Sequence, residues 1–457
     1  MRAARASIPL CLAATVLAIV GATRVAVALA DEAGHQSALI LIKAGRLLDV
    51  RTGRYVENAA VLVDKDRIRE AGPAAVVAGH APKEVAVVDL GSAVLLPGLI
   101  DCHAHLLDAM QGRMSSRENL LSTVAQLGPA RRALLGAAMA REDLDAGITT
   151  VRNVGHSGVD GDAALRDAIE AGWVTGPRIQ AATRKLTPPG GQAVTGMTAA
   201  AAAVIDTEFI TISGVDEARR AVREDLHAGA DVIKIVAHEG NRLLGPDEVR
   251  AIVEEAHRAH VKVAAHAWDD TAIGIVVDAG VDSVEHGDEI SDANLRKMRD
   301  KGIFLVATDR TPQAWMDLFG KSLYATPEET AEFAQRAKGW SDKGADRLRR
   351  AMKAGVKIAF GTDMWHEFPG MKRGAASLLT LEAYRDAGMP PLQIIQTATV
   401  NAADLLGWQD RVGVLEAGRF ADIIAVAGDP LREITELEHV IFVMKGGVVV
   451  RNDLAED

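Results

Sequence analysis

The sequence has 457 residues, of which 48% are apolar and 25% charged, a balance typical of a folded globular protein and not of a disordered one. Its formal net charge of -11 repels nucleic acid and anionic membranes, so we expect neither as a partner. The length exceeds that of one ordinary domain, but an α/β barrel with insertions can hold most of it.

The first 30 residues have the layout of a secretory signal peptide. Two arginines precede an apolar run, and Ala-Leu-Ala at 28–30 offers a cleavage site. A membrane anchor is the alternative, but Arg24 interrupts the run, which is shorter than the ~20 residues that a membrane span needs. We therefore expect cleavage near Ala30 and a periplasmic or secreted bacterial protein with no membrane attachment. The mature chain would keep only Cys102, so it could form no internal disulfide.

Short β-type runs separated by turn residues fill positions 38–93, and a matching set follows at 412–453. Between them, over 94–411, strand-like runs alternate with helical patterns such as those at 215–229 and 246–260. This alternation predicts repeated βα units and a parallel sheet. Most of the runs are apolar throughout, as in strands buried on both faces. The fold class is therefore α/β, and the predicted eight strands of a (β/α)8 barrel lie at 94–103, 148–153, 177–183, 231–236, 261–266, 282–286, 303–307 and 357–362.

Several predicted strands end in a residue that can bind a metal or handle a proton. These residues are His103, His105, Lys234, His266, His286 and Asp363. His103 and His105 are two apart on one strand, so their side chains face the same way and can bind one cation. The carboxyl ends of barrel strands converge on one face, where the others would join them. A hydrogen-bonded core role is the simpler explanation for one histidine, but not for four at strand ends.

This order of residues resembles the amidohydrolase superfamily. Its binuclear members carry two His on the first barrel strand, a carboxylated Lys on the fourth, His on the fifth and sixth, and Asp on the eighth. The resemblance implies two divalent metal ions, with zinc expected from the ligand set, and a CO2-derived carbamate on Lys234 that bridges them. An ion-paired buried lysine is the alternative there. The resemblance also implies a homo-oligomer and a small β-sandwich made from 38–93 and 412–453.

The implied activity is that of an exported metal-dependent amidohydrolase, similar to Xaa-Pro dipeptidase-like and ochratoxinase-like members. It would cleave the amide (C–N) bond of a dipeptide or N-acyl amino acid by attack of a metal-bridging hydroxide. Asp363 would take the proton from the hydroxide and pass it to the leaving nitrogen. A helix N-cap is the alternative role for Asp363, because aspartate is favoured at that position.

The expected substrate contacts are less regular than the metal ligands. Gln192 stands where dipeptidase-like relatives usually place a histidine, so it would donate a hydrogen bond but could not act as an imidazolium. His238 and Glu239 replace the Ser-Gly that often follows the lysine strand. We predict substrate contact for these three and for His366, and catalytic roles for Gln192 and His238. His156 follows the second strand in a glycine-rich loop and is a weaker candidate.

Two other functions are compatible with such a barrel. A mononuclear hydrolase of the imidazolonepropionase or deaminase kind usually has a Glu just beyond the fifth-strand His, whereas Trp268 and Asp269 stand here. A barrel that has lost catalysis and serves as a binding protein would not need all six metal-site residues. We therefore favour the binuclear hydrolase, acting on a small-molecule amide or dipeptide.

Overall fold

The computed structural model describes residues 39–108, 126–192, 206–320, 326–365 and 370–455, with the single residues 124 and 203. Strands and helices alternate along most of it, so the α/β class is confirmed. The predicted signal peptide and His366 lie outside the described residues. No helix in the described ranges combines the length and the apolar character that a membrane crossing requires.

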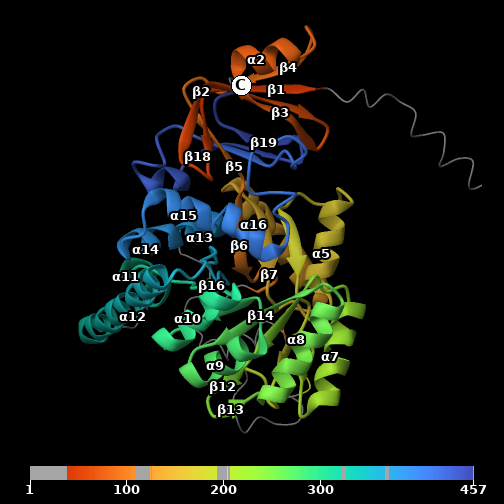
Figure 1. Ribbon diagram of the computed structural model, residues 1–457, viewed down its shortest axis with the longest axis vertical. Coiled ribbons are helices and arrows are strands. Elements are labelled where there is room, and N and C mark those ends of the chain that lie inside the picture. Colours follow the sequence, from red (N-terminus) through yellow and green to blue (C-terminus); the bar gives the residue numbers. More distant parts are fainter. Residues whose placement is uncertain are drawn as a thin grey trace, which may run out of the picture.

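The two ends of the chain build one eight-stranded sheet, at the top of Figure 1. Its strands are β1 (Ile40–Asp49), β2 (Arg54–Asp64), β3 (Arg67–Pro73), β4 (Ala86–Asp89), β5 (Val94–Pro97), β17 (Ile423–Val426), β18 (Val440–Lys445) and β19 (Val448–Asn452). The order is β19-β18-β17-β5-β1-β2-β3, with β4 beside β1. The C-terminal strands therefore join through the β17–β5 pair. The eight strands are hydrogen-bonded into one sheet, whereas a sandwich has two sheets facing each other. The predicted sandwich is therefore not confirmed.

The first predicted barrel strand is divided between two sheets. Residues 94–97 form β5 of the terminal sheet, and β6 (Leu99–Ala104) starts a parallel sheet directly after Gly98. A Cβ atom at Gly98 would lie 2.1 Å from Oγ1 of Thr149 on the neighbouring strand, so only glycine fits at this crossing. The apolar run at 94–103 gave no sign of the break, because both of its halves are buried.

The remaining parallel strands fall into two sheets. One contains β6, β7 (Ile148–Asn153) and β8 (Arg178–Ala181), and the other contains β9 (Lys185–Thr187), β10 (Phe209–Thr211), β11 (Val232–Val236), β14 (Lys262–Ala267), β15 (Ser283–His286) and β16 (Phe304–Val306). The order in the larger sheet is β10-β9-β11-β14-β15-β16. The predicted second to seventh strands are thus present, β9 and β10 were not predicted, and the named strands do not form one closed sheet.

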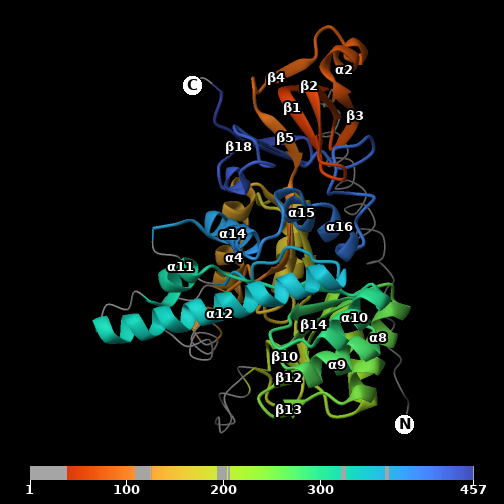
Figure 2. The same ribbon diagram turned by 60° about the vertical axis from the view of Figure 1, so that its left-hand side comes forward.

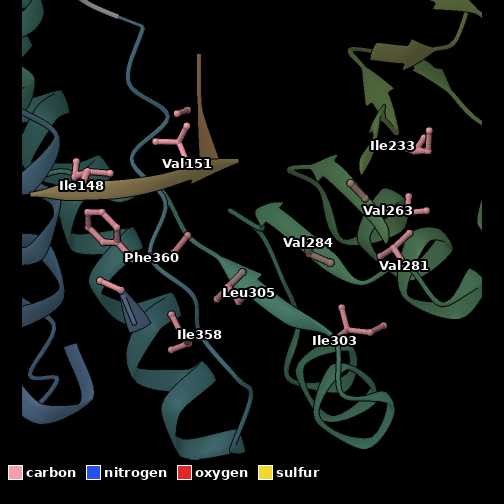
Figure 3. Close-up of a cluster of buried hydrophobic side chains, with 14 of the residues drawn as sticks. Ile148, Val151, Ile233, Val263, Val281, Val284, Ile303, Leu305, Ile358 and Phe360 are labelled. Atoms are coloured by element: carbon pink, nitrogen blue, oxygen red, sulfur yellow. The ribbon is translucent and has the colours of Figure 1, made fainter. Parts of the chain in front are cut away.

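The predicted eighth strand at 357–362 is not a regular strand, but it connects the two parallel sheets. The Ala359 N–H donates to the Leu305 carbonyl on β16, and the Cys102 N–H on β6 donates to the Phe360 carbonyl. Figure 3 shows two apolar side chains of this segment, Ile358 and Phe360, in one buried cluster with Leu305 of β16. The segment therefore brings the ends of β16 and β6 close together.

Helices cover the parallel sheets. The predicted helical segments are confirmed as α7 (Val215–His227) and α8 (Pro246–Arg258), which pack against each other. The others are α2 (Ala74–His80), which covers the terminal sheet, α4 (Pro129–Asp145), α5 (Gly161–Glu170), α9 (Asp270–Ala279), α10 (Asp292–Lys301), α11 (Pro312–Trp315), α12 (Pro327–Ala354), α13 (Arg373–Leu378), α14 (Thr380–Asp386), α15 (Pro391–Thr397) and α16 (Val400–Leu406).

The 28-residue helix α12 crosses the face of the molecule in Figure 2. Thr326 and Glu329 form a capping box at its start, and Gly355 ends it in the left-handed conformation. Near its C-terminal end the buried Arg347 binds Asp288 and Asp309, each at 2.5 Å. These ion pairs fix the helix to the loops that follow β15 and β16.

Candidate metal centre and active site

A cavity of about 830 Å³ lies at the carboxyl ends of the parallel strands. All six residues predicted for the metal site line it: His103, His105, Lys234, His266, His286 and Asp363. The chain bends sharply at several of these strand ends. His286, Thr308 and Asp363 have backbone φ angles of 68°, 56° and 49°, which residues other than glycine rarely adopt. Such strained residues tend to cluster at functional sites.

The histidines and Asp363 form one compact cluster. The His103 and His286 rings are 5.0 Å apart between centroids, and the His266 and His286 rings are 4.7 Å apart. Asp363 Oδ1 lies 3.2 Å from His105 Nε2 and 3.5 Å from His103 Nε2. One ligand atom from each of His103, His286 and Asp363 lies within 4.8 Å of the other two. Side chains from distant parts of the sequence therefore converge as predicted.

Hydrogen bonds on the far side of the rings determine which nitrogen faces the cluster. His105 Nδ1 is 2.9 Å from the Gly155 carbonyl, which can only accept, so Nδ1 carries the hydrogen. His103 Nδ1 is 2.6 Å from the Glu285 carboxylate and donates to it in the same way. In the neutral rings both Nε2 lone pairs then point toward the Asp363 carboxylate. Lone pairs in this arrangement repel one another unless a cation lies among them.

Burial keeps the imidazoles neutral. It lowers the pKa of His103 to about 4, helped by the charge of Lys234, and lowers the pKa values of His266 and His286 well below their usual range. Burial alone would raise the pKa of Asp363, but the imidazole nitrogens of His105 and His103 beside its carboxylate hold that pKa well below its usual range. Neutral imidazole and ionised carboxylate are the forms that bind metal ions.

Two buried polar atoms in the cluster add to this argument. Lys234 is 2% exposed, and its Nζ has no hydrogen-bond partner among the described residues; the same is true of His266 Nε2. Burial lowers the pKa of Lys234 to about 8. An unpaired buried cation is costly, so it is normally modified, neutralised or given a partner. Together with the facing lone pairs, His266 Nε2 forms a donor set that fits divalent cations, whereas Lys234 could bind one only after its ammonium group is modified.

A buried ion pair, which the sequence pattern did not predict, supports His103. Glu285 accepts from His103 through Oε2 and from Arg152 Nη2 through Oε1, at 2.8 Å. Arg152 Nε also donates to the Cys102 carbonyl at 2.6 Å. The only sign in the sequence was a charged residue inside each of two apolar strands, since such residues are rarely buried without a partner. A carboxylate behind a metal-binding histidine fixes the tautomer and orientation of the ring.

We therefore expect Glu285→Gln to lower metal affinity by roughly 10- to 100-fold, because the amide cannot hold the His103 ring as an ionised carboxylate does. The matched control is Ser283→Ala, which removes only the hydroxyl that donates to the other Glu285 oxygen. Metal titration and thermal unfolding of both variants would check this. Unchanged metal affinity in a folded Glu285→Gln protein would show that the ion pair serves stability alone.

On another wall of the cavity, Gln192 lies beside Lys185, which was not among the predicted site residues. Its Oε1 accepts from Lys185 Nζ at 2.5 Å, and the same ammonium lies 2.6 Å from His156 Nε2. All three residues line the cavity. Burial and the charge of Lys234 lower the pKa of Lys185 to about 7. The short strand β9 was not predicted, so nothing in the sequence placed this lysine in the site.

His238 and Glu239 occupy different places. Glu239 lines the cavity, whereas His238 does not. His238 accepts from the Trp268 backbone N–H through Nε2 at 3.0 Å, and its Nδ1 lies 2.9 Å from Asp269. The ring is thus directed at the turn after β14 and not at the space for substrate. This geometry does not support the predicted contact of His238 with substrate. The hydrogen bond to the Trp268 backbone suits a role in positioning Trp268 instead.

Aromatic side chains form much of the remaining lining. Four of the six tryptophans of the chain face this one cavity, in a sequence with only 4% aromatic residues. They are Trp268, Trp315, Trp340 and Trp365. The Trp340 ring lies 5.2 Å from Trp315 and 5.8 Å from Phe333, measured between centroids. Helices α11 and α12 therefore supply an apolar wall that suits a ring or another bulky apolar group.

Known proteins resemble this chain over most of its length. Residues 94–450 match the amidohydrolase family. An ochratoxinase from Aspergillus niger is 30% identical over 383 residues, which cover 78% of this chain and 75% of that protein. An imidazolonepropionase from Streptomyces coelicolor is 28% identical over 389 residues, 80% of this chain and 85% of that one.

Solved structures give the same result. A Xaa-Pro dipeptidase with methionine bound in its active site superimposes with a TM-score of 0.75 at 29% identity, covering 90% of this chain and 99% of the other. The crystal structure of the A. niger ochratoxinase gives a TM-score of 0.74 at 28% identity, over 92% and 96% of the two chains. The chain therefore belongs to the amidohydrolase family and is a hydrolase of carbon–nitrogen bonds.

Proposed function

We propose that this chain is a binuclear metal hydrolase that cleaves the amide bond of a dipeptide or an N-acyl amino acid. The observation that carries the proposal is the donor set itself: neutral, buried imidazoles whose free nitrogens face the ionised Asp363 carboxylate. Hydrogen bonds alone do not satisfy this arrangement, whereas cations do. The similarity to a Xaa-Pro dipeptidase and an ochratoxinase supports the same reaction class.

In this proposal His103 and His105 would hold one ion and His266 and His286 the other, and a carbamate on Lys234 would supply further ligand oxygens. Zinc is the expected ion, because imidazole, carboxylate and carbamate oxygen are ligands that it accepts. When bound, the two ions supply Lewis acidity, which lowers the pKa of water and polarises a carbonyl group. The orphaned Nζ of Lys234 is the feature of this chain that the carbamate would explain.

Asp363 is the proton carrier in the proposed reaction. Its carboxylate lies beside the Nε2 atoms of His103 and His105, and its low pKa keeps it in the ionised form, which is the form that has a free oxygen for a proton. It would take the proton of the attacking water and deliver it to the leaving nitrogen, which must be protonated to depart. The N-cap alternative has no support, because α13 begins only at Arg373 and α11 is capped by Thr311.

The surrounding scaffold and setting are also part of the proposal. We place the site on a (β/α)8 barrel that the segment at 357–364 would close, beside a β-sandwich made by the two chain ends. The backbone hydrogen bonds of that segment to β16 and β6 support the closure. The signal-like residues 1–30 support export to the periplasm or beyond. Assembly as a homo-oligomer follows only from the family resemblance.

A substrate panel tests the proposed reaction. Zinc-loaded enzyme would be assayed on dipeptides and N-acyl amino acids, each with an aromatic and an aliphatic member, and on a cyclic amide. We expect amide cleavage, greatest with aromatic members because of the tryptophan wall. Hydrolysis of the cyclic amide alone would favour the mononuclear alternative. Absence of any turnover by fully metal-loaded protein would refute the proposal.

A further inference from the structure

Lys185 is held rigidly at the edge of the metal cluster. Its aliphatic part lies against Gly155, where an added Cβ would come within 2.6 Å of Lys185 Cγ, so the glycine makes room for it. The residue is 2% exposed and lines the cavity. The His156 ring that it contacts lies 4.8 Å from His105 between centroids. The ammonium group is therefore one imidazole away from the predicted metal ligands.

The charge of Lys185 is not balanced by a direct partner. Its two hydrogen-bond partners, His156 Nε2 and Gln192 Oε1, are neutral acceptors, the Phe209 ring centroid lies 5.3 Å from its Nζ, and no described carboxylate forms an ion pair with it. The carboxylates of Asp363, Glu208 and Asp108 act on its charge only from farther away, and Glu208 is already bound to Arg132. An ammonium group has three hydrogens, and two are used here. The third is available to a molecule in the cavity.

A buried cation needs an anion to offset the loss of water around it. We propose that Lys185, positioned by Gln192 and His156, binds the free carboxylate of the substrate. This inference rests on the proposed function and narrows it to amides whose amino-acid part has an ionised carboxyl group. In such substrates the carboxylate is separated from the scissile nitrogen by one carbon atom, which suits a cation beside the metal cluster. Lys185 would then determine specificity, while Asp363 and the metal site perform the cleavage.

The test compares an N-acyl amino acid with the primary amide of the same compound, which has nearly the same shape but no negative charge. We expect the wild-type protein to prefer the acid, and Lys185→Met to reduce the kcat/KM ratio of acid to amide by roughly 10- to 100-fold, the usual worth of a hydrogen bond to a charged group. The kcat/KM for the amide should fall by much less than that for the acid. Lys185→Arg, which keeps the charge, should restore part of the preference.

A binding measurement makes the test independent of turnover. Calorimetry with the two compounds in an Asp363→Asn background, with and without Lys185→Met, should show that the lysine strengthens binding of the acid only. An equal loss for acid and amide would mean that Lys185 acts on the scissile carbonyl, and loss of bound metal would assign it to the metal centre. Either result would overturn the inference. Carboxylate-selective binding without hydrolysis by the wild-type protein would instead refute the proposed function alone.

Discussion

Asp363→Asn should lower kcat by roughly 10²–10⁴-fold while leaving most of the bound metal in place. Asparagine keeps the shape of the side chain and one carbonyl oxygen, but it cannot accept a proton. In the structure Asp363 Oδ1 lies 3.2 and 3.5 Å from the imidazole nitrogens of His105 and His103, beside the expected position of the scissile bond. Steady-state kinetics together with metal analysis of the same preparation would check this.

Asp288→Asn is the matched control for this prediction. Asp288 also lines the cavity, but its carboxylate binds Arg347 and is 57% exposed. Its removal should change kcat by much less than the removal of Asp363. If Asp363→Asn lost its metal and regained full kcat after metal was added back, Asp363 would be a structural ligand and the proton would have another carrier.

Lys234→Ala should lose the paired metals and nearly all activity. The buried Nζ has no hydrogen-bond partner among the described residues, and a bridging carbamate would give this position two ligand oxygens. Short carboxylic acids such as formate, acetate or propionate should restore part of the metal content and activity, because they can place two oxygens in the space that the side chain leaves. Metal content and rate measured against acid concentration would show the rescue.

Lys262→Ala provides the control for removal of a lysine from the same sheet. Lys262 lies at the other end of β14, where it binds Asp282 and is partly exposed. We expect wild-type metal content and no response to added acids in this variant. Wild-type activity in Lys234→Ala would exclude the carbamate, and metal retention without rescue would point to an unmodified lysine.

The parts of the fold that could be predicted from sequence are those with strong local patterns. The apolar runs of β7, β11, β14 and β15 identified buried parallel strands, and polar residues at their ends indicated a shared site. The break at Gly98 could not be seen, because it depends on the approach of Thr149 from another strand. The irregular segment at 357–362 is likewise held by hydrogen bonds to β16 and β6, which no local pattern reveals.

The same distinction holds for the site. The side chains of His103, His286 and Asp363 meet as predicted, because strand ends converge in a parallel sheet whatever the loops do. Lys185 and Glu285 were missed, because their importance comes from partners far away in the sequence: Gln192 and His156 for one, Arg152 and His103 for the other. A lone charged residue in a strand indicates that a partner exists, but not which one. Their roles in the reaction remain predictions.

The metal content of the purified protein, measured by elemental analysis together with the hydrolysis rate, tests the central claim most directly. The proposed centre predicts close to two divalent ions per chain, with activity lost on chelation and regained as both ions are replaced. One ion per chain at full activity would contradict the binuclear mechanism and favour the mononuclear alternative. A fully active protein without metal would contradict the account of the site altogether.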